Sequence, residues 1–267
     1  TASAFIGGIP TGYGTNFLYG ESDWVVMEAD EYDRSFWSLS PNIASIASMD
    51  ADHLDVYGSH DVMKEGFEGF IRKINEDGVL LIMDPLQKKL SKGLKSELNK
   101  KNIRIKSLGI DSGEIQAQEV RVIGGQYVFD YVSERYTITD LAMKMPGKHN
   151  VENALVAISI ALERGCDPND IRKAIGSFSG VKRRFEIFYQ TKDLVMIDDY
   201  AHHPTELRMA IDAARNLYPG KKLTGIFQPH LFSRTQDFYK EFAEVLDELD
   251  ECILIPVYPA RELSIKG

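Results

Sequence analysis

Strand-like apolar runs alternate with helix-length segments in the first part of the chain, and this alternation limits the possible folds more than any other feature. The runs span residues 23–27, 43–49, 78–83 and 103–108, and helices are expected at 61–75 and 85–99. The runs are too short for helices, whereas the segments between them are long enough. Repeated βαβ units build a mainly parallel sheet. We therefore expect an α/β fold with a mainly parallel sheet.

The pattern changes between residues 115 and 142. Apolar and polar residues alternate there in three stretches, QAQEVRV, QYVFDYV and RYTITDL, with Gly124-Gly125 at one turn. This period of two predicts a small antiparallel accessory sheet. Residues 149–164 then place apolar side chains on one helical stripe, and Gly165 suits the end of that helix.

A second unit is expected after the glycine-bearing segment GSFSGVKRR. With 267 residues the chain is long enough for two cores. Beyond Gly180 the pattern predicts a hairpin at 185–198, helices at 204–217 and 232–249, and strands at 223–227 and 252–257. We expect a central domain at residues 1–180 and a smaller, truncated Rossmann-like α/β domain at 181–267.

The composition limits the class of partner. A formal net charge of −9 argues against broad attraction to nucleic acid or anionic lipid, because both favour basic surfaces. No apolar run approaches the ~20 residues of a membrane-spanning helix, and the two cysteines have no metal-type spacing. We expect a cytoplasmic protein without nucleic acid or membrane as partner. Its start without methionine and its end without a final helix also predict an excerpt of a longer protein.

Acidic side chains follow two of the predicted strands. VVMEADEYDRS places Glu28 and three further carboxylates after one strand, and IASMDADHLD places His53 among three aspartates after the next. Ligands of open parallel sheets bind beyond the carboxyl ends of the strands, so adjacent strands would bring these groups together. The set suits a divalent cation that carries nucleotide phosphates, although histidine is an unusual magnesium ligand. Acidic helix-capping loops are the alternative.

Four further segments could carry chemistry. In MPGKHNVENA, Asn150 and Asn153 stand one turn apart at a helix start, where amides could bind a base or simply cap the helix. In VKRRFE and FQPHLFSRT, arginines could meet an anion or could be ordinary surface residues. The corner DDYAHHPTE crowds Asp199, Tyr200 and His202 between a strand and a helix. The sequence contains no G-x-x-x-x-G-K-[ST], G-x-S-x-G or G-x-G-x-x-G motif.

The chain resembles the Mur ligase family in seven segments that keep the family's order: FIGGIPTGYGTN, EADEYDRSF, DADHLDVYG, MPGKHNVENA, GVKRRFE, DDYAHHPTE and FQPHLFSRT. The family combines a domain for the UDP-sugar, a central ATPase and a C-terminal domain for the amino acid. The resemblance implies most of the central domain and the first part of the C-terminal one. The family's phosphate loop would lie just upstream of Thr1, so the fragment alone is not expected to be active.

The resemblance implies ATP and Mg²⁺ as cofactors. Glu28 and His53 match the family's magnesium-associated pair. The residues that match contacts to adenine or to the rest of the nucleotide are Asn150, Asn153, Arg184 and Asp199.

The resemblance is closest to the alanine-adding branch, which implies UDP-N-acetylmuramate and L-alanine as substrates. Thr15 and Asn16 match a glycine-rich strip near the phosphates and the sugar, and Tyr200, His202 and Arg234 match the alanine pocket. Many relatives carry a basic residue where this chain has Leu231, so recognition of the amino acid's charge would depend more on Arg234. The modified lysine of sister ligases has no counterpart.

The implied reaction uses ATP to phosphorylate a carboxylate, which the amine of alanine then attacks. Phosphoryl transfer depends on positioning and charge neutralisation, a task that suits Mg²⁺, Glu28, His53 and Arg184. The amine must lose a proton, and His202 or His53 titrates in a useful range, so we hypothesise His202 as the base. The alternatives are a ligase that attaches a whole peptide to recycled UDP-sugar, and a non-catalytic nucleotide-binding module that serves as a regulatory partner.

Overall fold

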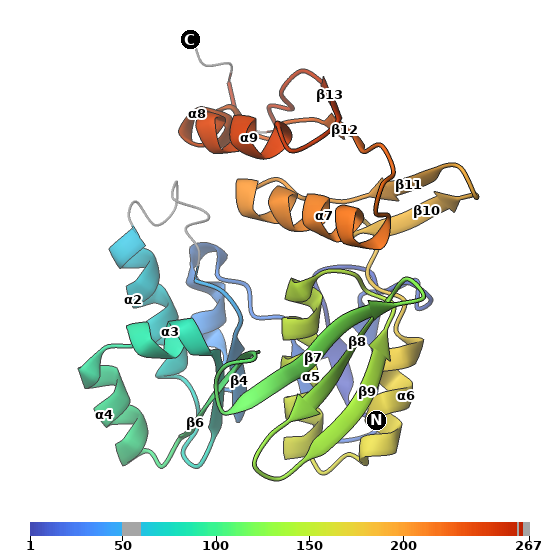
Figure 1. Ribbon diagram of the computed structural model, residues 1–267. Helices are drawn as coiled ribbons and strands as arrows, with labels where there is room; N and C mark the ends of the chain where they lie inside the picture. The colour runs from blue at the N-terminus through green and yellow to red at the C-terminus, as the bar shows by residue number, and fades with distance from the viewer. Residues whose placement is uncertain (50–59, 261, 264–267) are drawn as a thin grey trace.

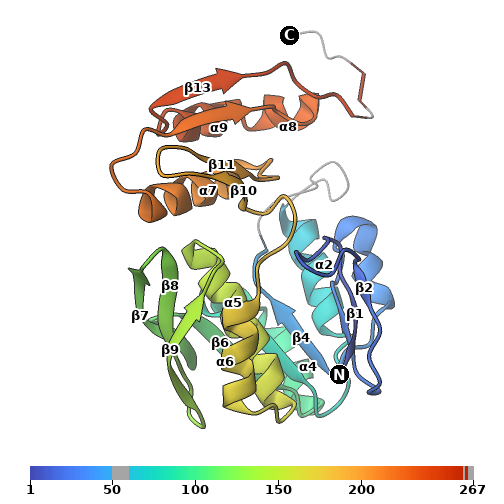
Figure 2. The ribbon, with the colours of Figure 1, turned by 90° about the vertical axis from the view of Figure 1, so that its right-hand side faces the viewer.

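The computed structural model describes residues 1–49, 60–260 and 262–263, and the chain is arranged in two stacked units (Figures 1 and 2). The lower unit holds a six-stranded and a three-stranded sheet, and the upper unit holds two sheets of two strands. The predicted α/β class is confirmed.

The six-stranded sheet has the order β4-β5-β6-β7-β8-β9. Strands β4 to β7 are parallel, and β7, β8 and β9 are antiparallel. The predicted antiparallel strands therefore extend the parallel sheet, to which they are joined where Leu108 of β6 pairs with Ile115 of β7. The strands are β4 (Ile43–Ile46), β5 (Val79–Met83), β6 (Arg104–Ile110), β7 (Ile115–Ile123), β8 (Gln126–Val132) and β9 (Thr137–Met143).

Helices cover both faces of this sheet. Because successive side chains of a strand point to opposite faces, the fully buried β5 contributes to two cores. Leu80 and Ile82 lie in one core with residues of α2 (His60–Ile71) and α4 (Lys92–Lys100), whereas Leu81 lies in the other with α5 (Lys148–Glu163). Two further α-helices among the described residues of the lower unit are α3 (Asp84–Lys89) and α6 (Pro168–Ser177).

The apolar stripe of α5 forms the centre of the larger core. Val151, Leu155 and Ile158 are almost completely buried against the sheet, as the sequence pattern predicted. Asp167 begins α6 by accepting a hydrogen bond from the backbone N–H of Asn169 (2.8 Å). These two helices place the start of α5 at the boundary with the upper unit (Figure 1).

The three-stranded sheet has the order β2-β1-β3 and precedes the 3₁₀ helix η1 (Tyr32–Ser38). Its strands are β1 (Ser3–Phe5), β2 (Phe17–Leu18) and β3 (Val25–Met27). Within the described residues β3 pairs with β1 and lies in a different sheet from β4, so the expectation that these two strands are adjacent was wrong. The period of an apolar run identifies a strand but does not identify its neighbour.

Among its described residues, the upper unit has two short sheets and three helices. β10 (Glu186–Gln190) and β11 (Val195–Asp198) form the predicted antiparallel hairpin, and β12 (Thr224–Phe227) pairs in parallel with β13 (Glu251–Leu254). The helices are α7 (Pro204–Leu217), α8 (Phe232–Asp237) and α9 (Tyr239–Leu246). The core of this unit is small, with a cluster of Phe185, Ala213 and Ala214 and with Ile211, Phe227, Phe242 and Val245 also buried.

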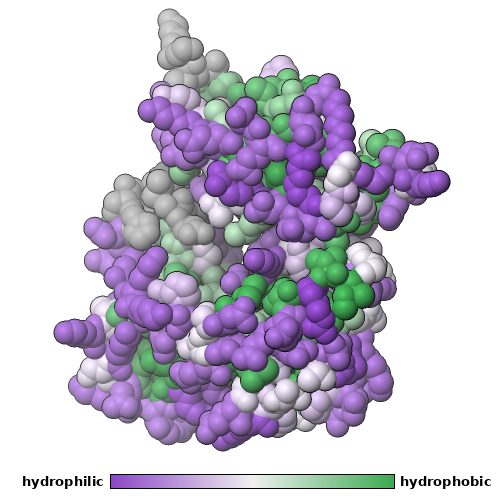
Figure 3. Space-filling view, in the orientation of Figure 1, coloured by the Kyte–Doolittle hydropathy of each residue, from purple (hydrophilic) through white to green (hydrophobic). Residues whose placement is uncertain are grey.

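The two units are in contact through α7. Leu217 packs against the core that contains Leu155, and the side chain of Asn216 lies close enough to the hydroxyl of Tyr127 to lower its pKa, which burial raises. The face in Figure 3 is mostly hydrophilic, with hydrophobic surface near the turn between β7 and β8 and on the upper unit near β12 and β13. In the part of the chain that the structure describes, no helix combines the length and apolarity needed to cross a membrane.

Candidate functional site

The corner between β11 and α7 is organised by the carboxylate of Asp199. One oxygen accepts the backbone N–H of Phe185 and the other accepts that of Ala201, each at 2.7 Å. Burial raises the pKa of Asp199, although both hydrogen bonds act in the opposite direction. Asp199 therefore ties the start of the upper unit to the loop that carries Tyr200 and His202.

Glu206, in the first turn of α7, connects this loop with the linker between the units, which comprises residues 178–184. Its carboxylate accepts the backbone N–H of His202 (3.0 Å) and lies 3.6 Å from the guanidinium of Arg184. Nδ1 of His202 lies 2.9 Å from the carbonyl oxygen of Tyr200 and 3.4 Å from Glu206. The guanidinium of Arg183 lies over the ring of Tyr200, 4.6 Å from its centroid. Cationic, acidic and imidazole groups thus meet within a few residues.

His149, at the start of α5, brings the lower unit into the same cluster. Burial lowers the pKa of His149, Asp199 raises it, Arg184 lowers it and Glu206 raises it. These electrostatic partners belong to the linker and to the upper unit. His149 and Glu206 were not among the predicted site residues. Two signals in the sequence were available: the histidine in GKHN and an acidic residue shortly after Pro204. In the structure this histidine follows Gly147, which has φ +96°, and the acidic residue lies in the first turn of α7.

The asparagines of α5 lie beside this histidine and contact each other. Asn150 donates from Nδ2 to the carbonyl oxygen of Pro146 (2.6 Å), and Nδ2 of Asn153 lies 3.5 Å from Oδ1 of Asn150. Asn153 is exposed and Asn150 is half-buried. The predicted proximity of the two amides is present, one turn apart on one helix.

Glu28 closes the glycine-rich loop that follows β1. Its Oε2 accepts the backbone N–H of Gly7 (2.6 Å), and a Cβ at Gly7 would lie 2.9 Å from Oε1. Thr15 and Asn16 lie at the other end of this loop, where the carbonyl oxygen of Asn16 accepts the N–H of Ile6 (3.0 Å). Glu28 therefore presents an exposed carboxylate beside Gly7 and Gly8, which carry no side chains, and such a carboxylate is a suitable ligand for a hard cation with anionic ligands.

The proposed partner of Glu28 at the metal, His53, lies outside the described residues, together with Asp50, Asp52 and Asp55. Among the residues that are described, no group of three or more histidine, cysteine, aspartate or glutamate side chains could hold a metal ion. Glu28 is therefore the described half of the predicted pair.

His230 and Arg234 lie at the corner between β12 and α8. The ring of His230 stacks on Tyr258 with centroids 5.6 Å apart, and it lies 6.4 Å from the ring of His202. Leu231 precedes α8 with φ +72°. Hydrogen bonds from Ser233 lower the pKa of Glu262, and the charge of Arg234 lowers it further, so a carboxylate of this chain already lies near that arginine.

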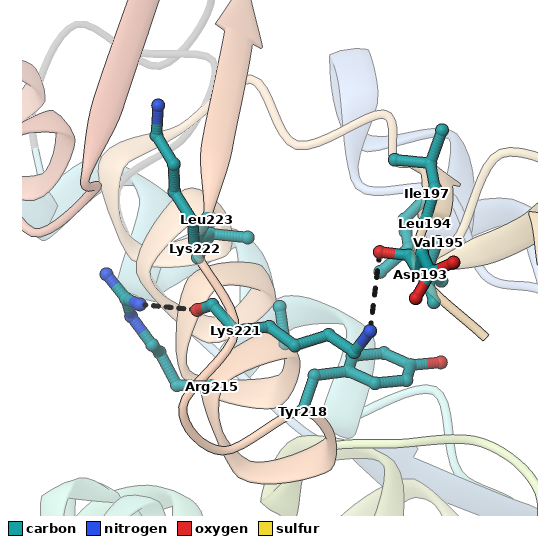
Figure 4. A pocket seen from close by; sticks show the side chains of 10 residues that line it. Asp193, Leu194, Val195, Ile197, Arg215, Tyr218, Lys221, Lys222 and Leu223 are labelled. Carbon is teal, nitrogen blue, oxygen red and sulfur yellow. Dashed lines mark hydrogen bonds between the residues drawn. The ribbon is translucent and has the colours of Figure 1, made fainter. Parts of the chain in front are cut away.

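A hollow of about 200 Å³ lies elsewhere, between the β10–β11 hairpin and the end of α7 (Figure 4). Three cations contribute to its lining, but each is engaged. Arg215 binds Asp250 (2.8 Å), Lys222 binds Glu251 (2.8 Å), and Lys221 donates to the carbonyl oxygen of Lys192 (2.9 Å). The titratable cluster described above lies outside this hollow.

Two family models match the chain. Residues 15–161 match the Mur ligase middle domain, and residues 183–265 match the model described as Mur ligase, glutamate ligase domain. Curated relatives named UDP-N-acetylmuramate–L-alanine ligase include that of Christiangramia forsetii, 44% identical, and that of Flavobacterium psychrophilum, 43% identical. Each match covers 99% of this chain and 56% of the relative, so the chain spans about half the length of these proteins.

Solved structures give the same family. The UDP-N-acetylmuramate-alanine ligase MurC from Thermotoga maritima has a TM-score of 0.77 at 28% identity, over 97% of this chain and 56% of that chain. A murein peptide ligase from Psychrobacter arcticus has a TM-score of 0.58 at 26% identity, over 95% of this chain and 57% of that one. With both of its units matched, this chain belongs to the Mur ligase family.

Proposed function

We propose that the chain is part of an ATP-dependent ligase that joins L-alanine to the lactyl carboxylate of UDP-N-acetylmuramate in the cytoplasm. Relatives that carry this name match 99% of the chain at up to 44% identity. In this proposal residues 1–180 belong to the central nucleotide-binding domain and residues 181–267 to the domain that brings the amino acid.

The cluster that joins the two units carries the proposal. Arg184 of the linker, Asp199 and Glu206 of the upper unit and His149 of the lower unit interact electrostatically. A ligase that transfers a phosphoryl group and then attaches an amine needs both substrates at one boundary, where positioned charges stabilise the transition state. The cluster occupies such a boundary.

Most of the residues suited to the nucleotide lie on the lower unit and the linker, and Asp199 lies on the upper unit. Asn150 and Asn153 would bind adenine through their amides, while Arg184 and Asp199 would contact the rest of the nucleotide. Glu28, together with His53, would hold Mg²⁺. When bound, MgATP supplies the phosphoryl group that converts the carboxylate into a good acyl donor. Thr15 and Asn16, on the glycine-rich loop, would contact the sugar substrate.

The residues suited to alanine lie on the upper unit. Tyr200, His202 and Arg234 would line its pocket, with Arg234 opposite the amino acid's carboxylate. Nδ1 of His202 lies against the carbonyl oxygen of Tyr200, so the ring proton is held on Nδ1 and the lone pair is on Nε2. In this tautomer Nε2 would take the proton from the ammonium of alanine.

The test uses a polypeptide of the relatives' length that contains this chain. Phosphate release that depends on UDP-N-acetylmuramate, ATP and L-alanine is expected, and its absence in a folded protein would reject the proposal. His202→Ala should lower turnover most near neutral pH, where an imidazole can be neutral while most alanine is still protonated. Turnover of His202→Ala equal to that of the parent from pH 6 to pH 9 would exclude His202 as the base.

A second candidate is a ligase that attaches a peptide in place of alanine. The similarity to the murein peptide ligase supports it, with a lower TM-score than that of the alanine ligase structure. The same assay with a tripeptide in place of alanine separates the two, because the preferred acceptor has the higher kcat/KM.

A further inference from the structure

The linker between the two units is hydrogen-bonded to the glycine-rich loop that follows β1. Pro10 and Val181 form an antiparallel bridge. The N–H of Thr11 donates to the carbonyl oxygen of Gly180 (2.7 Å), and the N–H of Lys182 donates to that of Ile9 (3.0 Å). In Figure 2 the linker is the yellow segment that rises from α6 to the upper unit. Residues that are far apart in the sequence thus form a short two-stranded clip, which comprises residues 8–11 and 180–182.

The clip requires close approach at Gly8. A Cβ at Gly8 would lie 2.5 Å from Cγ1 of Val181, whereas its next nearest neighbour would be Cβ of Val181 at 3.9 Å. The backbone of Gly8 has a φ that other residues also adopt, so the contact with Val181 is what disfavours a side chain there. Val181 is stiff at χ1 and cannot move its methyl group away easily. One methyl group therefore decides whether residue 8 can carry a side chain.

Each strand of the clip is connected, by a hydrogen bond near one of its ends, to a candidate functional residue. On one side, Gly7 donates its N–H to the Glu28 carboxylate (2.6 Å). On the other side, the N–H of Arg184 donates to the carbonyl oxygen of Val181 (3.1 Å). The carbonyl oxygen of Arg183 then accepts the N–H of Tyr200 (2.8 Å). The clip is thus a backbone path from the loop at Glu28 to the loop at Tyr200.

We propose that the clip sets the position of Arg184 relative to the Glu28 carboxylate, and that Gly8 and Val181 are positioning residues for the nucleotide site. This inference rests on the proposed function, because it assigns the phosphates to Arg184 and the metal to Glu28. The clip's geometry itself does not depend on that function, so the two can be tested separately.

The first experiment uses the 267-residue chain and needs no ligand. Trypsin can cleave after Lys182, Arg183 and Arg184, which are exposed but held by the clip. Gly8→Ala should accelerate cleavage there by about tenfold, the factor that corresponds to an overpacking cost of about 1.4 kcal/mol. Val181→Ala removes the obstructing methyl group, so the double variant should return to within about twofold of the parent, as should Val181→Ala alone.

The second experiment uses the longer polypeptide. Gly8→Ala should raise KM for MgATP about tenfold with little change in Tm, and Val181→Ala should restore it in the double variant. If trypsin cleaved Gly8→Ala and the parent at the same rate, the inference that the clip holds the linker would be wrong. Rescue of cleavage without rescue of KM would overturn the positioning role. A parent without ligase activity would overturn the proposed function, and the cleavage experiment would still decide whether the clip exists.

Discussion

Asp199→Asn is expected to loosen the junction between the linker and α7. The carboxylate of Asp199 accepts the N–H groups of Phe185 and Ala201 with one oxygen each, both at 2.7 Å. Asparagine has one carbonyl oxygen, and its NH₂ group would face the second N–H, so one donor would lose its acceptor. Hydrogen bonds to charged groups contribute about 1.5–3 kcal/mol, and the half-buried position of Asp199 favours the middle of that range, about 2 kcal/mol.

Hydrogen exchange measures this loss where it occurs. A local cost of about 2 kcal/mol accelerates exchange of the Phe185 and Ala201 amides by about 30-fold, because 1.4 kcal/mol is a factor of ten. The matched control is Asp198→Asn, since Asp198 lies 3.9 Å from Nε of Arg183 in an exposed pair that contributes little. Equal exchange rates in the two variants would refute the assignment of these bonds to Asp199.

The pH dependence provides an independent check of the same carboxylate. Burial raises the pKa of Asp199 in the folded chain above its ordinary value, so the folded state binds this proton more tightly than the unfolded state does. The free energy of unfolding therefore falls as pH rises from the ordinary value through the raised one. Asp199→Asn removes this decline, so the stability difference between parent and variant should shrink across that range. A difference that grows with pH would contradict the raised pKa.

Three further substitutions test other parts of the structure. Glu28→Gln keeps an oxygen for the N–H of Gly7 but removes the charge; at least a tenfold higher Mg²⁺ requirement is expected in phosphate-release assays, since even outer-shell ligands change metal affinity by about 10–100-fold. Glu163→Gln removes the negative charge and leaves one accepting oxygen for Arg104 (2.8 Å) and Lys106, so it should cost about 1–2 kcal/mol in urea denaturation at pH 7. Burial raises the pKa of Glu163 but its bonds to the two cations lower it overall, so this contribution should vanish as pH falls through the lowered pKa. Leu155→Ala, at a completely buried position, should cost about 2–5 kcal/mol in the same assay, and a loss below about 1 kcal/mol would contradict its place in the core.

Local sequence signals predicted elements whose boundaries depend on nearby residues. A helix was predicted at 204–217, and α7 has these bounds, with Pro204 at its first position after the capping residue His203. The segment at 85–99 was predicted as one helix but forms α3 and α4, because Ser91 between them is held by Glu68 through two hydrogen bonds. The helical period continues through such a break, and the residue that causes it lies far away in the sequence. The helix predicted at 232–249 is likewise divided at Phe238.

The residues of the candidate site likewise include some that a local sequence pattern predicted and others that it did not. The spacing of Asn150 and Asn153 predicted two amides on one turn, which the helix supplies. His149 and Glu206 were missed because their significance comes from the contact between the two units, which no local pattern encodes. The expected adjacency of β3 and β4 failed for a related reason, since strand pairing is a long-range choice.

The unequal sizes of the three hydrophobic cores have a consequence for the order in which the two units unfold. Two extensive clusters hold the six-stranded sheet, whereas the unit with α7 has one small cluster of Phe185, Ala213 and Ala214 and a few further buried apolar side chains, namely Ile211, Phe227, Phe242 and Val245. Heating should therefore melt this upper unit first and leave an intact frame beneath it, in two transitions rather than one. The part of the chain that carries Tyr200 and His202 is thus the one that can change its place without disturbing the rest.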